Sequence, residues 1–238
     1  MGDDGRGELA ELAALTAEHL RHEMDLGNAY LPRGILRAPV APERDSAGDS
    51  IDRLTVLTDE AAACTRCRLH EGRTKSVFAR GSANASLVFV GEGPGYHEDQ
   101  SGLPFVGKAG QLLDKMIVAM GFGADDVYIC NVVKCRPPDN RTPNADEAAA
   151  CLPYLKEQLA LVAPDVIVAL GRHAAENLGV AEPGRRWRGQ WGQWQSIRVM
   201  PTYHPAYLLR NPENKRVVWQ DLQTVVKALG RELPTRSS

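Results

Sequence analysis

The stretch LVFVGEGPGYHEDQSGLPFVGKAG, residues 87–110, decides the fold. It opens with four apolar residues, Leu87–Val90, and then turns at once into glycines and acids. A short apolar run that ends in glycine is typical of a buried strand, and ligands often bind where such strands end. A dinucleotide loop does not fit. Gly91 and Gly93 match two glycines of G-x-G-x-x-G, but a tyrosine stands at the third position, and the acids nearby would repel a pyrophosphate.

Strand and helix patterns alternate along the rest of the chain. The predicted strands cover residues 87–90, 127–133, 165–170 and 195–205, and the predicted helices cover residues 109–120, 144–162 and 214–229. Asn144 followed by Glu147 is a typical capping pair for the second helix. Strands that alternate with helices indicate a parallel sheet covered on both faces. The sequence therefore predicts an α/β fold with three layers, α/β/α, around a central, mostly parallel four-stranded sheet.

The chain is expected to contain one main domain with extensions. Residues 1–53 predict an amphipathic helix, over residues 7–31, and a linker rich in Pro, Gly and Ser. Residues 54–230 form the main domain, and residues 231–238 form a flexible tail. No apolar run approaches the ~18 residues of a membrane span, and the acidic N-terminus lacks the pattern of a signal peptide. We therefore expect a cytoplasmic protein without a membrane segment.

Charge is distributed unevenly along the chain. Residues 1–60 carry 6 basic and 13 acidic side chains, and the remainder carries 22 basic and 17 acidic ones. Residues 183–219 hold 7 basic side chains and 1 acidic one, interleaved with tryptophan and tyrosine. This mixture favours a surface that binds a polyanion with flat bases. The alternative is an ordinary solvated arginine face over core aromatics.

The cysteines suggest a metal centre. Cys64 and Cys67 form a C-x2-C turn, and Cys135 and Cys151 are separated by fifteen residues. Four thiolates can enclose zinc or an iron–sulfur cluster. The long second spacing suits a zinc ribbon poorly, whereas a [4Fe–4S] cluster can take ligands from separate loops. Four unrelated core cysteines are the remaining alternative. Cys130, within a predicted strand, is interpreted as a small buried hydrophobic residue.

Six motifs in order resemble the family 4 uracil-DNA glycosylases, which are iron–sulfur enzymes. The C-x2-C turn is followed by these segments: GEGPG (91–95), GLPFVGKAGQLLDKM (102–116), NVVKCRPPDNRTP (131–143), PDVIVALG (164–171) and YHPAYLL (203–209). The resemblance covers residues 54–229. It implies a uracil-DNA glycosylase-like fold and an enzyme that flips deoxyuridine out of DNA, hydrolyses its N-glycosidic bond and starts base excision repair.

The resemblance also implies roles for individual residues. Gly91 and Gly93 bring the backbone close to the flipped nucleotide, and Phe105 stacks on the uracil. Asn131 pairs with the uracil edge through its amide. The implied catalytic residues are Glu92, at the pocket floor, and His204, which hydrogen-bonds uracil O2.

Further residues are implied to hold the DNA and the cofactor. Leu208 resembles the wedge that fills the gap left by the flipped base, and Arg210 contacts phosphate. A basic loop with Lys134, Arg136 and Arg141 is expected to face the DNA. The implied ligands of a [4Fe–4S] cluster with a structural role are Cys64, Cys67, Cys135 and Cys151. The expected partner is uracil-containing DNA, bound by a monomer.

Two other classes of function stay open. The first is a non-catalytic iron–sulfur DNA-binding or polymerase-associated module of the same fold. It would be favoured if Glu92 or His204 were missing, and both are present. The second is a redox or nucleotide-binding protein with a Rossmann-like sheet. It predicts an acid about twenty residues after the glycine turn, but Asp114 falls inside a predicted helix instead.

Overall fold

The computed structural model describes residues 47–182, 184 and 186–234. The predicted helix over residues 7–31 and the last four residues of the tail lie outside this range. The helices are α2 (Ala47–Ala63), α3 (Tyr96–Ser101), α4 (Lys108–Ala119), α5 (Ala145–Val162), α6 (Arg172–Asn177), α7 (Pro205–Arg210) and α8 (Lys215–Ala228). Short 3-10 helices are η1 (Arg68–Glu71), η2 (Ala124–Asp126), η3 (Pro138–Asn140) and η4 (Pro212–Asn214). Within the described ranges, no helix combines the length and the apolar character needed to cross a membrane.

The central sheet has six strands in the order β1-β3-β2-β4-β6-β5. The strands are β1 (Ala79–Gly81), β2 (Leu87–Gly91), β3 (Val127–Asn131), β4 (Val166–Leu170), β5 (Gly192–Trp194) and β6 (Ile197–Thr202). The four predicted strands are β2, β3, β4 and β6, and they run parallel. The predicted class is therefore confirmed, but the count of four strands is wrong. Two antiparallel edge strands, β1 and β5, were missed because three residues are too few to show a period.

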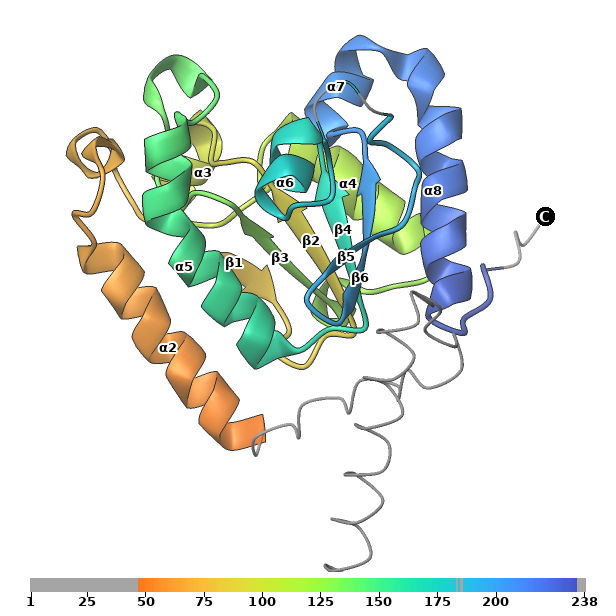
Figure 1. Cartoon of the computed structure of the whole chain (residues 1–238), viewed down its shortest axis with the longest axis horizontal. Coiled ribbons are helices and arrows are strands. Elements are labelled where there is room, and N and C mark those ends of the chain that lie inside the picture. Colours follow the sequence, from red (N-terminus) through yellow and green to blue (C-terminus); the bar gives the residue numbers. More distant parts are fainter. Residues whose placement is uncertain (1–46, 183, 185, 235–238) are drawn as a thin grey trace, which may run out of the picture. The chain divides into compact units, whose positions relative to one another are not determined.

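Helices cover both faces of the sheet, as Figure 1 shows for α5 on one side and α4 on the other. Successive strand residues point to opposite faces. Val88 and Val90 of β2 pack toward α2, α5 and α6. Leu87 and Phe89 pack toward α4 and α8. All four side chains are fully buried, and this explains why the strand reads as a continuous apolar run.

The start of α5 is held by a buried carboxylate. The Glu147 side chain is fully buried and accepts hydrogen bonds from the Asn144 N–H (2.8 Å) and from both terminal nitrogens of Arg141 (2.8 and 2.7 Å). The hydrogen-bonded guanidinium of Arg141 lowers the pKa of Glu147, and the Asn144 N–H acts in the same direction. The predicted pairing of Asn144 with Glu147 is thus present, and it fixes the loop that precedes α5.

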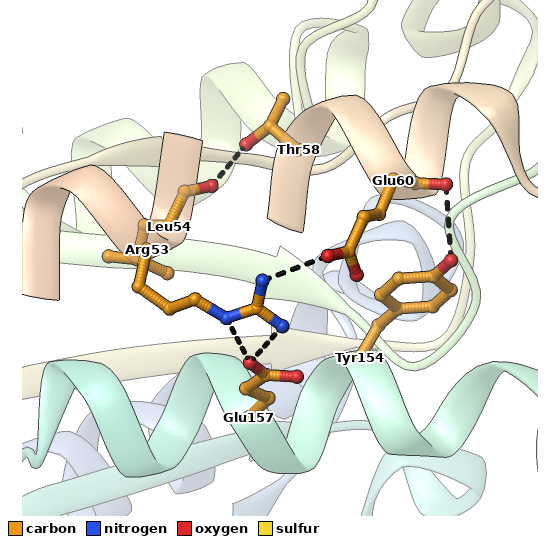
Figure 2. A network of polar contacts seen from close by, with 6 residues as sticks. All are labelled: Arg53, Leu54, Thr58, Glu60, Tyr154 and Glu157. Atoms are coloured by element: carbon orange, nitrogen blue, oxygen red, sulfur yellow. Dashed lines mark hydrogen bonds and ion pairs between the residues drawn. The ribbon is translucent and has the colours of Figure 1, made fainter. Parts of the chain in front are cut away.

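Helix α2 packs on α5 and begins at Ala47, ahead of the predicted domain start at residue 54. Figure 2 shows the polar contacts that join the two helices. Arg53 donates to Glu157 of α5 (2.6 Å) and to Glu60 of its own helix (2.8 Å). The Tyr154 hydroxyl of α5 donates to the Glu60 main-chain oxygen (3.1 Å). Because the ion pairs are partly exposed, the apolar face of α2 supplies most of the attachment.

We expect Leu57→Ala to destabilise the protein by about 2–4 kcal/mol, because this side chain is 1% exposed in the core between α2 and α5. Val56→Ala, one position along, is the matched control. Val56 is 48% exposed, so its truncation should change stability by no more than about 0.5 kcal/mol. Urea unfolding followed by circular dichroism measures both. Equal midpoints for the two variants would show that α2 is not part of the cooperative core.

Candidate active site

A cavity of about 470 Å³ opens where the parallel strands end. In parallel sheets the carboxyl ends of the strands share one edge, so the residues that follow β2, β3 and β6 meet there. The cavity is lined by Glu92, Gly93, Pro94, Gly95, Glu98, Phe105, Ala109, Asn131, Pro137, Asn140, Arg141, Thr142, Pro143, His204, Ala206, Tyr207 and Arg210. Both predicted catalytic residues are among them.

The end of β2 is tightly surrounded. A Cβ atom on Gly91 would lie 2.3 Å from Asn131 Oδ1 and 2.6 Å from Phe105 Cζ. A Cβ atom on Gly93 would lie 2.7 Å from Val133 Cγ2. A side chain at either position would therefore force these neighbouring side chains to shift. The intervening Glu92 lines the cavity, and its main-chain oxygen accepts from the Val133 N–H at 3.2 Å.

Phe105 stands in the loop between α3 and α4. Its ring is 6% exposed and stacks on the His204 imidazole, with ring centroids 5.5 Å apart and planes inclined by 28°. Its backbone has a φ of +57°, in the left-handed region that bulky residues seldom adopt. The structure thus brings the two predicted residues together as neighbours in one cavity.

Asn131 is the last residue of β3 and pairs in register with Gly91. Its side chain is 2% exposed. The Oδ1 atom is buried and accepts no hydrogen bond from the residues that the structure describes. Buried amide groups are nearly always satisfied, so an unpaired one in a cavity wall is typical of a site that completes its bonds with a ligand.

His204 follows β6 and caps helix α7. Its Nδ1 accepts a hydrogen bond from the Ala206 N–H at 3.1 Å, which places the proton of the neutral ring on Nε2. Burial, and to a smaller extent the charge of Arg210, lowers its pKa from 6.5 to about 4, while Glu98 acts in the opposite direction. At neutral pH the ring is therefore an uncharged group with one N–H to donate.

Helix α7 carries the predicted DNA contacts. Arg210 is exposed and lines the cavity, as expected of a phosphate contact. Leu208, the predicted wedge, is 1% exposed and packs among the core residues beneath α7. The next side chain, Leu209, is 47% exposed. A wedge role for Leu208 stays a prediction that requires this side chain to leave the core, whereas Leu209 already stands outside.

Glu98 is a cavity residue that the sequence analysis did not single out. Its Oε1 accepts hydrogen bonds from the Val106 N–H (2.9 Å) and the Gly107 N–H (2.8 Å). These bonds fix the loop directly after Phe105. An acid in the first turn of a helix that follows a glycine-rich loop is the available signal, but that pattern equally fits an ordinary helix start.

The four predicted cluster ligands surround one second cavity. It is lined by Ala61, Cys64, Arg66, Cys67, His70, Lys134, Cys135, Ala150, Cys151 and Tyr154. Cys130 lies outside it, fully buried in β3, which confirms its interpretation as a core residue. Arg73 donates to Cys135 Sγ (3.2 Å) and to the Cys64 main-chain oxygen (2.8 Å). Arg73 is thus a hydrogen-bond donor to a cysteine sulfur in the wall of this cavity.

Lys134 does not face solvent, so the prediction of a DNA contact there is wrong. It is 1% exposed. Its Nζ donates to the Asn131 main-chain oxygen (2.6 Å) and to Gln158, and its main-chain N–H donates to Cys151 Sγ (3.3 Å). The aliphatic stem packs in the core and the two acceptors satisfy the amine, although burial lowers the pKa of Lys134. The sequence shows only a lysine two residues before Arg136.

The four cysteines that line this cavity equal in number the thiolates that an iron–sulfur cluster takes. Within the described part of the chain, no group of three or more His, Cys, Asp or Glu side chains is arranged to hold one metal ion. A [4Fe–4S] cluster is larger and takes four thiolates, as many as this cavity provides. Burial raises the pKa of Cys151 to about 11 and also raises that of Cys135. Binding iron at these thiols therefore requires the release of protons.

We expect His204 to titrate with a midpoint near pH 4, because its burial disfavours the charged form. An unfolded chain takes up this proton near pH 6.5, so protonation favours the unfolded state between pH 6.5 and 4, and stability falls as the pH falls through that window. The Cε1–Hε1 resonances of the six histidines report the midpoints, and His204→Gln identifies the signal. A midpoint near 6.5 for that signal would contradict the proposed burial.

Comparison with known proteins agrees with this geometry. The family model of the uracil DNA glycosylase superfamily matches residues 78–223. A type-4 uracil-DNA glycosylase of Thermotoga maritima is 44% identical over 184 residues, covering 75% of this chain and 96% of the relative. A type-4 uracil-DNA glycosylase of Saccharolobus solfataricus is 40% identical over 190 residues, covering 75% and 88%. A DNA polymerase of Bacillus phage SP01 is 28% identical over 167 residues, 70% of this chain but 18% of the polymerase. The chain therefore belongs to the uracil DNA glycosylase superfamily and, within it, to the type-4 uracil-DNA glycosylases.

Proposed function

We propose that this protein hydrolyses the N-glycosidic bond of deoxyuridine in DNA, releases uracil and leaves an abasic site for base excision repair. Membership of the type-4 family supports the activity. The observation that carries the assignment to this cavity is one arrangement of three groups. A neutral His204, an aromatic ring at Phe105 and the amide of Asn131, whose buried Oδ1 accepts no hydrogen bond from the described residues, line it together.

The cavity suits an extruded base. A volume of about 470 Å³ lies within the range of small-molecule sites. A carboxamide presents one acceptor and one donor side, which match the adjacent N–H and C=O of a uracil edge. The Phe105 ring supplies a flat apolar face for stacking, worth about 1–3 kcal/mol per base. Leaving the duplex is least costly for a base in a mismatch or a single strand.

His204 is proposed to act as an uncharged donor. Cleavage of the N1–C1′ bond leaves a uracil anion whose charge extends to O2. The Nε2–H of His204 stabilises that charge without itself losing a proton, which is the logic of an oxyanion hole. Because the Ala206 N–H occupies Nδ1, the ring keeps the tautomer that this role requires.

Glu92 is proposed to act on the sugar side. The departing base leaves an oxocarbenium-like sugar, and a nearby carboxylate stabilises its positive charge and orients the attacking water. The main-chain bonds between the ends of β2 and β3 hold Glu92 beside Asn131. Arg210 is proposed to bind phosphate, and Leu208 is proposed to enter the base stack, a role for which this buried side chain must leave the core.

The cavity formed by Cys64, Cys67, Cys135 and Cys151 is proposed to hold a [4Fe–4S] cluster. When bound, the cluster would join segments that are far apart in the sequence, and it would take no part in the reaction. Two of the proposed ligands follow α2, Cys135 lies in the loop after β3, and Cys151 lies in α5. We further propose that residues 54–230, with the preceding part of α2, form the glycosylase domain, and that the protein acts as a monomer in the cytoplasm.

A non-catalytic, polymerase-associated module is the second candidate. The similarity to a small part of a phage DNA polymerase favours it, because that stretch lies inside a larger replication protein. The two candidates predict different outcomes for a uracil substrate. The module binds DNA and leaves the uracil in place.

Incubation with a labelled oligonucleotide that contains one uracil, followed by alkali, tests the proposed activity. We expect strand scission at the uracil and none with a thymine substrate. Glu92→Ala and His204→Ala should each lower the rate by about 100-fold or more, because each removes stabilisation of charge in the transition state. Asp125→Ala, an exposed acid on η2, is the control and should match the wild type. DNA binding without scission would support the non-catalytic module.

Iron content tests the cluster separately from activity. Anaerobically purified wild-type protein should hold about four iron atoms per chain and absorb visible light. Cys135→Ala should lose most of the iron because it removes a ligand. Cys130→Ala removes a thiol of β3 outside the cavity and should retain it. Equal iron contents in the two variants would contradict the ligand assignment.

A further inference from the structure

Phe105 adopts a backbone conformation that its own side chain disfavours. With φ at +57°, it lies in the left-handed region, where a bulky residue persists only if its surroundings hold it there. The ring is nonetheless well placed, stacked on His204 and in contact with the backbone at Gly91. Some other part of the chain must therefore impose this conformation.

Arg80 makes the contacts that do so. Its Nε donates to the Pro104 main-chain oxygen at 2.9 Å, and its Nη2 makes a longer contact of 3.4 Å with the Phe105 main-chain oxygen. One guanidinium thus binds the carbonyl groups on both sides of the Phe105 backbone. A rigid, planar group with several donors is suited to fix the relative orientation of two peptide units.

Arg80 is itself held in place. It is the central residue of strand β1, where it pairs with Ile129 of β3. Its Nη2 also contacts Asp114 Oδ1 of α4 at 2.5 Å. The side chain is 20% exposed, so most of it is packed. The guanidinium therefore connects edge strand β1 to the loop that contains Phe105.

The rest of the loop leaves Phe105 little freedom. A Cβ atom on Gly110 would lie 1.7 Å from the Phe105 main-chain oxygen, so α4 approaches that carbonyl as closely as a glycine allows. Glu98 binds the two N–H groups that follow Phe105. Arg80 donates hydrogen bonds to the main-chain oxygens of this loop, and Glu98 accepts hydrogen bonds from its main-chain N–H groups. Together they fix the loop before and after Phe105.

We infer that Arg80 is a positioning residue for the base-stacking ring. By binding the carbonyls of Pro104 and Phe105 it keeps Phe105 in the left-handed conformation and its ring against His204. The inference rests on the proposed function only for the claim that this ring stacks on uracil. The alternative is that Arg80 merely stabilises the fold, and the two readings predict different couplings between Arg80 and Phe105.

The test is a double-mutant cycle of Arg80→Met with Phe105→Ala. Methionine keeps an unbranched apolar stem and removes the donors. Single-turnover rates are measured with enzyme in excess over a uracil oligonucleotide, and affinity with an oligonucleotide that carries the hydrolysis-resistant 2′-fluoro-deoxyuridine. We expect Arg80→Met to lower the rate about 10-fold or more in the wild-type background, because small misplacements cost large factors in rate. In the Phe105→Ala background it should change the rate less than about twofold, since the ring it positions is absent.

Two further variants test whether the effect depends on the hydrogen-bond donors of Arg80. Asp114→Asn removes the charge that pairs with Arg80 but keeps an acceptor, and it should stay within about twofold of the wild type. Arg80→Lys keeps one donor and should recover part of the lost rate, and it replaces Arg80→Met in the cycle if that variant does not fold. An equal loss from Arg80→Met in both backgrounds, or no loss in either, would overturn the inference.

A measurement independent of activity separates this inference from the proposed function. The Phe105 ring lies over His204 and shifts its Cε1–Hε1 resonance. Arg80→Met should move that resonance toward its position in Phe105→Ala, and Asp114→Asn should leave it in place. If the wild type releases no uracil, the proposed function fails, and the resonance alone decides the role of Arg80. An unmoved resonance in Arg80→Met overturns that role.

Discussion

The absence of a side chain at Gly91 is the constraint on which the cavity depends. This residue ends β2 beside Asn131 on the parallel strand β3, and the space of its missing Cβ is filled by the Asn131 amide and the Phe105 ring. The Asn131 amide and the Phe105 ring can meet at the end of the sheet because Gly91 of β2 has no side chain between them. Any other residue at this position would displace the amide or the ring, or both.

Several groups at the centre of the cavity are neutral, and apart from Glu92 and Arg210 the charged side chains that line it are already engaged. His204 is held uncharged, and Asn131 and Phe105 carry no charge at all. Arg141 is bound to the buried Glu147, and Glu98 is bound to the loop after Phe105. Oriented dipoles in a low-dielectric site stabilise developing charge strongly, and they attract fewer counterions than fixed charges. Arg210, the proposed phosphate contact, is exposed.

Much of this arrangement could be predicted because local pattern and tertiary position agree. Three of the four parallel strands, β2, β3 and β4, are buried along their whole length, and β6 is buried over its last four residues. Such strands consist largely of apolar residues, and the residues after them are placed by the rule for parallel sheets. The capping pair Asn144 and Glu147 could also be predicted, because its sequence spacing matches its contact in the structure. The three-residue edge strands carry no such period and were missed.

Other features depend on contacts that sequence does not display. The order Leu208–Leu209 does not say which leucine of a six-residue helix faces the core. Lys134 stands two residues before Arg136, yet it is buried, with acceptors from the Asn131 main chain and from Gln158 of α5. The left-handed backbone of Phe105 and its contacts with Arg80 require the sheet edge and the loop to be assembled first.

Lys134 links two parts of the molecule that have different chemistry. Its side chain donates to the main-chain oxygen of Asn131, the residue proposed to pair with the base, and its main-chain N–H donates to the sulfur of Cys151. Oxidation of that sulfur would remove an acceptor from the same residue that supports Asn131. With the proposed cluster in the cysteine cavity, a change at Cys151 would reach Asn131 through this one residue.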